Sequence, residues 1–501
     1  MKDRAPTYPG RVKLEPVAGQ TNIYDMTRAD APTVTGTPFN TRTMLQDSTA
    51  LFLNLPYANP LVDDAFRHLP DRIEPVGTVK TSPALSLGDA WLPCNGGQIT
   101  FSDYPLLYQI LRNLSSATTW SGTTYTTDAT KFNKMTDPVY FKGKWYIFGS
   151  LIEYSGSSTW QSHATLTLAS ASSLSGAWSI EKTWSNYDTD YSWFSGDAPP
   201  VAAAATEDKI VCVWAYYYVS NGEFRTFSST DGSTWTQSEN VNTHYAGAIA
   251  SVSSLATDKS MWAFLANGAT QCSSNPDIAS SWVNVDSAFA DGTTLSVCGS
   301  TWFVVSEGNI KTATTPSGTW TTILNASSLP ESSYAAYYSN VAQFSGAYYM
   351  AYASRYGGGS NSNKYVSLWL IKFSLNGEFT SKKIKTTAWT GGEYQARIVT
   401  GNRIMAILYG LGGADGEQRA ILTSSSPDVG FDDVSLPSGV NPKGIAVQGD
   451  VVVCNNDSTV AYHDYTSDVR TLPSISLSDD TTTFIKAKNE LDVFEAQQNG
   501  G

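Results

Sequence analysis

A repeat of about fifty residues, the length of one propeller blade, is the feature that most constrains how this chain folds. From residue 134 onward, short turns rich in Gly, Asp and Asn precede apolar runs such as Trp145-Tyr146-Ile147-Phe148 and Ile210-Val211-Cys212-Val213-Trp214. The seven turns are Gly143-Lys144, Asp208-Lys209, Asp258-Lys259, Gly299-Ser300, Gly346-Ala347, Gly401-Asn402 and Gly449-Asp450. These residue types suit tight β-hairpin turns. Each period therefore predicts a hairpin.

A second feature recurs in six of the seven periods: one aromatic residue follows a turn. These residues are Trp178, Trp235, Trp282, Trp320, Phe379 and Phe431. Two hairpins per period make a four-stranded blade, so the sequence predicts a seven-bladed β-propeller over residues 115–470. Residues 116–132 add either a closing strand or the start of another blade.

One of these turns has a recognisable form. The stretch Ser229-Thr230-Asp231-Gly232-Ser233-Thr234-Trp235 resembles the Asp-box of sialidase-like propellers, although it has one residue fewer between Asp and Gly. Asp231 is expected to accept turn amides, Gly232 to adopt positive φ, and Trp235 to pack between blades. The resemblance implies a folding role and no catalytic one.

The stretch upstream of the repeats is Gly88-Asp89-Ala90-Trp91-Leu92-Pro93-Cys94-Asn95-Gly96-Gly97. A short strand is expected before it, from Gly77 to Lys80. After it, Ser102 or Asp103 is a candidate cap for an amphipathic helix with Pro105 in its first turn. The expected buried face of this helix consists of Tyr104, Leu107, Tyr108 and Leu111. The stretch from Val76 to Arg112 resembles the phage tail-collar domain.

The closing strands of that family are missing after Arg112 and reappear far downstream. They match Thr471-Leu472-Pro473-Ser474-Ile475-Ser476 and Thr483-Phe484-Ile485-Lys486-Ala487-Lys488. Insertions succeed where two chain ends lie close together on a surface loop. The resemblance therefore implies a split tail-collar domain, with its first half at 71–114, the propeller inserted at 115–470, and its second half with the C-terminal tail at 471–501.

Residues 1–70 are expected to form an extended arm. Asn40 or Thr41 is a candidate cap for a short helix that carries Met44, Leu45 and Leu51. The segment resembles the N-terminal portion of phage tail-fibre proteins, which implies virion attachment. An ordinary extended arm is the alternative.

The composition excludes some classes of binding partner and indicates where the protein is made. The net charge of −13 argues against nucleic acid or an anionic membrane as the main partner. No apolar stretch is long enough to span a membrane, and the N-terminus has no apolar signal core. The five scattered cysteines indicate buried free thiols made in a reducing cytoplasm. The four histidines show no metal-ligand spacing, and no cofactor is indicated.

Function is expected on the face that carries the longer loops, which are rich in aromatic residues. Tyr and Trp offer a large contact area with little entropy to lose, as stacking on a sugar requires. The candidate ligand-binding residues are Tyr154, Trp160, Trp184, Tyr187, Tyr191, Trp193, Tyr217, Arg355 and Tyr356. The alternative is that aromatic side chains pack in the core between blades, which we expect for Tyr146 and Tyr349.

Together these features predict a tail-fibre or tail-tip protein of a bacteriophage that binds a host-surface glycan and is not an enzyme. The resemblance further implies a homotrimer, located in the virion, that contacts other tail or baseplate proteins. Two alternatives remain. One is a sialidase-like tail-spike hydrolase, with its acids drawn from loop carboxylates such as Glu153, Asp188 and Glu417. The other is a purely structural tail component.

Overall fold

A computed structural model describes residues 5–6, 12–16, 24–28, 32–34, 76–82, 87, 89–111, 117–154, 162–185, 200–218, 221–246, 252–285, 289–290, 293–331, 336–356, 365–388, 396–410, 419–475 and 482–488. It divides into two compact units. Unit 1 comprises Met1–Gly97 and Thr471–Gly501, and unit 2 comprises Gln98–Arg470. The predicted helix near Asn40 and the remainder of the N-terminal arm lie outside the described residues, apart from four short strands.

Those four strands form two small sheets in unit 1. Strand β1 (Ala5–Pro6) pairs with β4 (Pro32–Val34), and β2 (Val12–Pro16) pairs with β3 (Tyr24–Arg28).

A third sheet of unit 1 joins distant parts of the sequence. Strand β40 (Thr482–Lys486) lies between β5 (Val79–Ser82) and β6 (Trp91–Pro93). Cys94 N donates to Thr483 O at 2.7 Å, and Ile475 N donates to Cys94 O at 3.0 Å. Trp91 and Phe484 pack together in its small core. The chain leaves this unit after Gly97 and returns at Thr471, so unit 2 is an insertion in unit 1.

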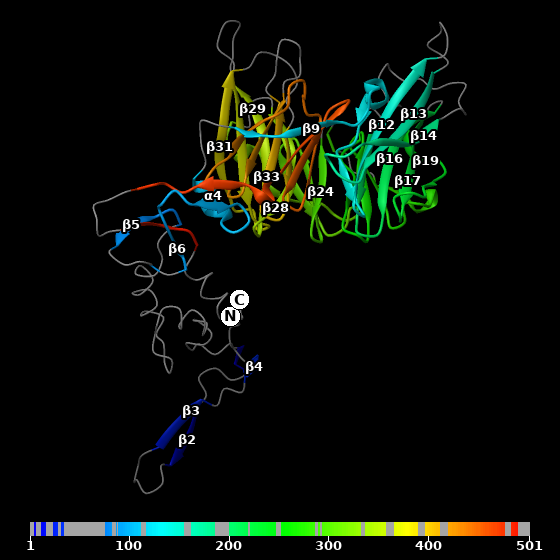
Figure 1. Ribbon diagram of the computed structural model, residues 1–501. Helices are drawn as coiled ribbons and strands as arrows, with labels where there is room; N and C mark the ends of the chain where they lie inside the picture. The colour runs from blue at the N-terminus through cyan, green and yellow to red at the C-terminus, as the bar shows by residue number, and fades with distance from the viewer. Residues whose placement is uncertain are drawn as a thin grey trace. The chain divides into compact units, whose positions relative to one another are not determined.

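Unit 2 is mainly β and propeller-like. In its described residues it contains seven sheets of four or five strands, which we number 1 to 7 in chain order (Figure 1). Sheet 1 contains β10 (Lys134–Met135), β11 (Val139–Phe141), β12 (Lys144–Tyr154), β13 (Ser162–Ala171) and β14 (Ser179–Ser185). Sheet 2 contains β15 (Val201–Ala205), β16 (Ile210–Tyr218), β17 (Asn221–Ser229), β18 (Thr236–Gln237) and β19 (Val241–Ala246). Sheet 3 contains β20 (Ala256–Thr257), β21 (Trp262–Ala266), β22 (Ala269–Ser273) and β23 (Val283–Val285). Sheet 4 contains β24 (Thr294–Cys298), β25 (Thr301–Ser306), β26 (Asn309–Ala313) and β27 (Thr321–Leu324).

The last three sheets continue the pattern. Sheet 5 contains β28 (Ala336–Phe344), β29 (Ala347–Tyr356), β30 (Tyr365–Phe373) and β31 (Phe379–Ala388). Sheet 6 contains β32 (Ala396–Thr400), β33 (Met405–Gly410), β34 (Arg419–Ser424) and β35 (Asp432–Ser435), with β8 (Thr118–Thr119) added in parallel to β35. Sheet 7 contains β36 (Gly444–Gln448), β37 (Val451–Asn455), β38 (Thr459–Asp464) and β9 (Ser121–Thr124). The 3-10 turns are η1 (Ala129–Phe132), η2 (Ala279–Ser281), η3 (Ala326–Ser328) and η4 (Tyr465–Ser467).

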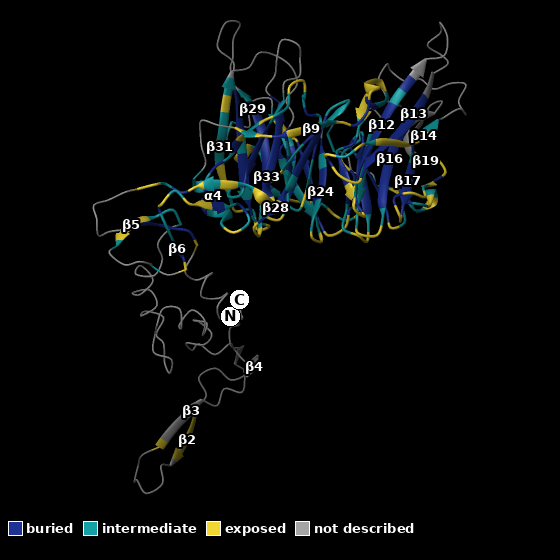
Figure 2. Ribbon diagram, viewed as in Figure 1, coloured by how far each residue is buried: buried dark blue, intermediate teal, exposed yellow. Residues whose placement is uncertain are grey.

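The hairpin turns fall where the sequence predicts them. Cys298 faces Thr301, and Gln448 faces Val451, so Gly299-Ser300 and Gly449-Asp450 are two-residue turns. The remaining five lie within a residue or two of the expected positions. Figure 2 shows that strands such as β12 and β16 are mostly buried while the turns are exposed.

The repeated aromatic residue packs each of sheets 2 to 6 onto the sheet before it. Trp235 of sheet 2 contacts Phe148 of sheet 1 with ring centroids 5.4 Å apart, and Trp282 of sheet 3 lies 5.1 Å from Phe224 of sheet 2. Trp320, Phe379 and Phe431 continue the pattern in sheets 4 to 6. These rings add to the buried hydrophobic core at each of these junctions.

The first and last sheets also pack against each other. Val453 and Val460 of sheet 7 share a core with Trp145 and Ile147 of sheet 1. Tyr125, which follows β9, lies in the same core. Because β9 comes from the beginning of unit 2 and pairs with β38 near its end, residues 116–132 supply a closing strand. This resolves the alternative that the sequence left open.

The Asp-box-like turn has the expected geometry. Asp231 Oδ1 accepts hydrogen bonds from Ser233 N and Thr234 N, both at 2.7 Å. These bonds, that from Thr234 foremost, hold the pKa of Asp231 well below its usual value. Gly232 has a φ of 77°, and a Cβ there would lie 2.1 Å from the Tyr146 hydroxyl. Local hydrogen bonds and a required glycine thus build this turn, as predicted.

Helix α4 (Pro105–Ile110) belongs to unit 2 and follows the short strand β7 (Gln98–Thr100), which pairs with β39 (Val469–Thr471). Its N-cap is Tyr104 and no side chain caps it, so the expected cap by Ser102 or Asp103 is wrong. Ser102 Oγ instead donates to Thr466 O at 2.6 Å. Leu107 and Tyr108 are buried as predicted.

Candidate functional site

The longer connections leave unit 2 at one end of its strands. Thr294 Oγ1 donates to Ser339 O, and Val341 N donates to Ser296 Oγ, so β24 and β28 run in the same direction. Because each sheet repeats the same antiparallel strand order, the second strands of the sheets also run in a common direction, opposite to that of the first strands. Three candidate residues lie at or next to the carboxyl ends of such strands, β12, β16 and β29. These residues are Tyr154, Tyr217 and Tyr356. We call this the loop end of unit 2.

Four other candidates, Trp160, Tyr187, Tyr191 and Trp193, lie outside the described residues. The same holds for the candidate acids Asp188 and Glu417, whereas Glu153 lies in β12.

Trp184 requires a correction. The sequence placed it in a loop, but it lies within strand β14. Its ring packs 4.8 Å from the Phe227 ring and 6.0 Å from the Trp235 ring, in the core between sheets 1 and 2. Lys182 Nζ lies 5.3 Å from the ring centroid. The contacts of Trp184 are thus those of a packing residue, like Tyr146 and Tyr349, which are buried as predicted.

Replacing this ring tests its packing role. Trp184→Ala is expected to lower the free energy of unfolding by about 2 kcal/mol, below the roughly 3–5 kcal/mol for a fully buried Trp, because the ring is half-buried. Thermal melting and glycan binding should be measured on the same preparation. Lost glycan binding with an unchanged melting temperature would contradict the packing role.

Sheet 5 exposes aromatic rings at the loop end. Tyr337 is 43% exposed and Tyr365 is 40% exposed, although most large aromatic residues in the described sheets are buried. Tyr337 pairs with Ala353, two residues before Arg355, so Tyr337 and Arg355 share one face of the sheet. Tyr365 pairs with Tyr356. Of these residues the sequence predicted Arg355 and Tyr356 as candidates but not Tyr365, whose only signal is an aromatic residue at the start of a strand.

A carboxylate lies close to this region. Glu331 accepts hydrogen bonds from Trp369 Nε1 at 3.1 Å and from Lys383 Nζ at 2.8 Å. Burial alone would raise the pKa of Glu331, but the bonds from Lys383, Trp369 and Ser367 outweigh burial and lower the pKa. Trp369 and Ser367 lie on the same face of β30 as Tyr365. One face of sheet 5 thus carries Tyr337 and Arg355 at the loop end, and the opposite face carries Tyr365 and the groups that bind the ionised Glu331 carboxylate.

The described part of the chain offers few other groups that suit catalysis or metal binding. All five cysteines are free. Four are buried, but Cys298 is partly exposed, which differs from the expectation. No group of three or more His, Cys, Asp or Glu side chains is arranged to hold a metal ion there. No helix of the described residues is both long and apolar enough to cross a membrane.

No protein-family model matches the chain, and no curated protein matches it. Solved structures similar to it include the GH74 enzyme of Niastella koreensis, with 12% identity and a TM-score of 0.33 over 61% of this chain and 48% of the enzyme. The endosialidase of phage phi92 has 9% identity and a TM-score of 0.36, over 72% of this chain and 75% of the endosialidase. A Trypanosoma rangeli sialidase mutant displaying trans-sialidase activity has 8% identity and a TM-score of 0.30, over 81% of this chain and 61% of the mutant. The match thus spans about half the length of the GH74 enzyme.

These neighbours contradict the prediction that the chain is not an enzyme, and we withdraw it. Two carboxylates from separate loops suffice for glycoside hydrolysis, and such a pair leaves no local sequence signature.

Proposed function

We propose that unit 2 is a closed seven-bladed propeller that binds a carbohydrate at its loop end, within a tail-fibre or tail-tip protein of a bacteriophage. The observation that carries the proposal is the exposure of two tyrosines at the loop end of sheet 5, Tyr337 on the face that carries Arg355 and Tyr365 on the opposite face. Exposed aromatic rings with a polar edge suit stacking on a sugar ring, and guanidinium and carboxylate groups suit its hydroxyls.

Unit 1 supports the assignment to a phage tail. The stretch from Gly88 to Gly97, which resembles the tail-collar domain, contributes β6, and the distant closing segment contributes β40 to the same sheet. In this proposal residues 1–70 attach the chain to other tail or baseplate proteins, and unit 2 is displayed toward the host. The protein is a homotrimer of the virion, and three copies strengthen weak sugar contacts through effective concentration.

Binding of the full-length protein to host cells and to extracted surface glycans tests the proposal. Tyr337→Ala and Tyr365→Ala are each expected to weaken binding by roughly 5- to 30-fold, the equivalent of about 1–2 kcal/mol. The matched control is Tyr140→Ala, because Tyr140 is 37% exposed but lies in β11, beside the turn at the opposite end of the strands. This control is expected to bind normally.

Three outcomes separate the possibilities. Weaker binding by both loop-end variants and normal binding by Tyr140→Ala supports the proposal. Equal binding by all variants overturns the placement of the glycan site on sheet 5. If the folded wild-type protein binds no glycan, glycan binding is overturned and a purely structural role in the tail is favoured. Reducing ends should be assayed in the same tubes, because their release would show that the bound glycan is also cut.

A further inference from the structure

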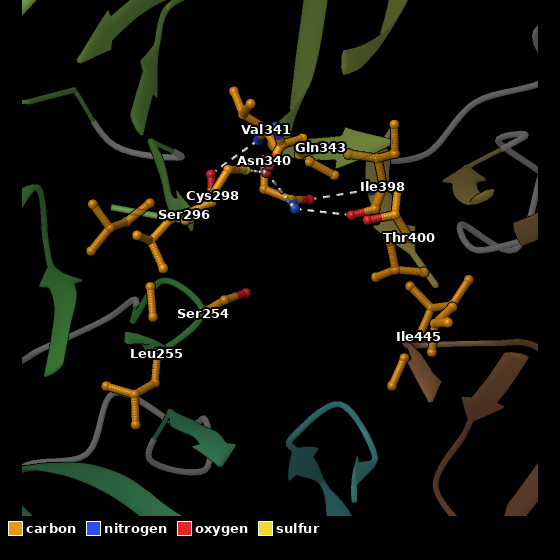
Figure 3. Close-up of a pocket in the computed structure, with 18 residues that line it drawn as sticks. Ser254, Leu255, Ser296, Cys298, Asn340, Val341, Gln343, Ile398, Thr400 and Ile445 are labelled. Atoms are coloured by element: carbon orange, nitrogen blue, oxygen red, sulfur yellow. Dashed lines mark hydrogen bonds between the residues drawn. The ribbon is translucent and has the colours of Figure 1, made fainter. Parts of the chain in front are cut away.

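A cavity of about 530 Å³ lies between the first strands of five consecutive sheets of unit 2. Strands β24, β28, β32 and β36 line it, together with Ser254, Leu255 and Ala256 at the start of sheet 3 (Figure 3). The volume is within the roughly 300–1,000 Å³ typical of small-molecule sites. The lining reaches Gly299 and Thr400, where turns begin, so it extends away from the loop end.

The walls of this cavity carry no charged side chain. All eighteen lining residues are neutral, and they mix aliphatic groups with hydroxyl and amide groups. The side chains of Ser254, Gln343 and Thr400 line the cavity and make no hydrogen bond to another described residue, so their polar groups are available to a ligand.

Other polar groups of the wall are held in place. Asn340 Nδ2 donates to Ile398 O at 2.9 Å, and Asn340 Oδ1 accepts from Ile398 N at 3.1 Å (Figure 3). Ser296 Oγ accepts from Val341 N at 3.1 Å. These bonds tie β24 to β28 and β28 to β32. The wall is therefore preorganised, which lowers the entropy that a ligand has to overcome.

The backbone adds further hydrogen-bonding groups. Strands β24, β28, β32 and β36 are each the edge strand of their sheet. An edge strand presents N–H and C=O groups that its own sheet does not pair, and in this wall side chains of neighbouring strands bond some of them, such as Val341 N and the N and O atoms of Ile398. The cavity thus offers donors and acceptors side by side without a fixed charge.

We propose that this cavity binds a small, neutral, hydroxyl-rich molecule of the size of a monosaccharide or a cyclic polyol. A hydroxyl group both donates and accepts hydrogen bonds, so such a ligand can pair with the uncharged donors and acceptors of the wall. A charged ligand loses its hydration and finds no opposite charge. The site is separate from the loop end of sheet 5 and does not depend on the function proposed above.

One side chain of the cavity wall can report whether a ligand is bound. Cys298 lines it and is the partly exposed cysteine, whereas the other four are buried. Burial raises the pKa of the Cys298 thiol to about 11. Since the thiolate is the nucleophile, alkylation of Cys298 is expected to accelerate about tenfold per pH unit between pH 7 and 10. Mass spectrometry of the native protein treated with iodoacetamide measures this rate, and a Cys298→Ser variant confirms the labelled site.

Ligand protection of Cys298 tests the proposal on the full-length protein. The probes are D-glucose, N-acetyl-D-glucosamine and myo-inositol, and the charged controls are N-acetylneuraminic acid and glucose 6-phosphate. At least one neutral probe is expected to slow alkylation at pH 9 by fivefold or more. Ser254→Trp fills the cavity and is expected to abolish this protection, whereas Gln448→Trp, at an exposed residue outside the lining, should retain it.

Calorimetric titration of the same probes provides a second measurement. Saturable binding of a neutral probe, lost in Ser254→Trp, supports the proposal even if Cys298 resists alkylation. Absence of binding by every neutral probe overturns it. Equal protection by the charged controls also overturns it, because a charged ligand should lose its hydration in this cavity without gaining an opposite charge.

Discussion

Tyr125→Ala is expected to lower the free energy of unfolding of unit 2 by about 3–5 kcal/mol, the range for truncating a buried aromatic ring. The Tyr125 ring is buried between the first and last sheets, 4.9 Å from the Phe132 ring and 5.8 Å from the Trp178 ring. Its hydroxyl donates to Asn456 O at 2.7 Å. The substitution therefore weakens the junction between sheets 1 and 7. Urea unfolding followed by tryptophan fluorescence measures the loss.

The matched control is Tyr125→Phe, which keeps the ring and removes the hydroxyl. It is expected to cost about 1 kcal/mol, the net value of one hydrogen bond. If the Ala and Phe variants unfold at the same urea concentration, packing of the Tyr125 ring does not stabilise the junction between sheets 1 and 7.

Asp432→Asn is expected to destabilise unit 2 by about 3 kcal/mol, because it leaves a largely buried guanidinium without its counter-charge. Arg470 Nη2 donates to Asp432 Oδ2 at 2.8 Å, and the two side chains are 15% and 9% exposed. Arg470 also donates to Tyr108 O, and its guanidinium lies 4.0 Å from the centre of the Tyr108 ring. This pair fixes helix α4 to sheet 6.

A double-mutant cycle measures this interaction by urea unfolding. Asp432→Asn combined with Arg470→Met is expected to be more stable than Asp432→Asn alone, because the uncompensated charge is gone. The exposed pair Lys372–Asp428 supplies the control, and Asp428→Asn should scarcely change the midpoint. Strictly additive effects of the Asp432 and Arg470 substitutions would contradict the proposed coupling.

The repeated sheets were predictable because their signals are local. A two-residue turn depends on its own glycine or aspartate, and an apolar run predicts a buried strand whatever lies beside it. Trp235 was correctly assigned to packing for the same reason. The helix cap was predicted wrongly because Ser102 bonds to Thr466, a partner far away in the sequence.

The candidate site was less predictable. Trp184 is followed by polar and aromatic residues typical of a loop, yet pairing with Leu166 of β13 extends the strand through it. The exposure of Tyr365 was not predictable, since it depends on where sheet 5 ends. Whether an aromatic residue at a strand end packs or faces solvent is set by the neighbouring sheet, and local sequence does not contain that information.

The sequence alone determined the β class of this protein, the period of its repeats and the positions of its turns, because each follows from residues close together in the chain. Tertiary structure alone decided how the repeats close, with β9 completing the sheet of β38, and which side chains line the cavity. It also decided which tyrosines stay exposed. These features depend on contacts between distant segments, whose geometry emerges only when the sheets pack.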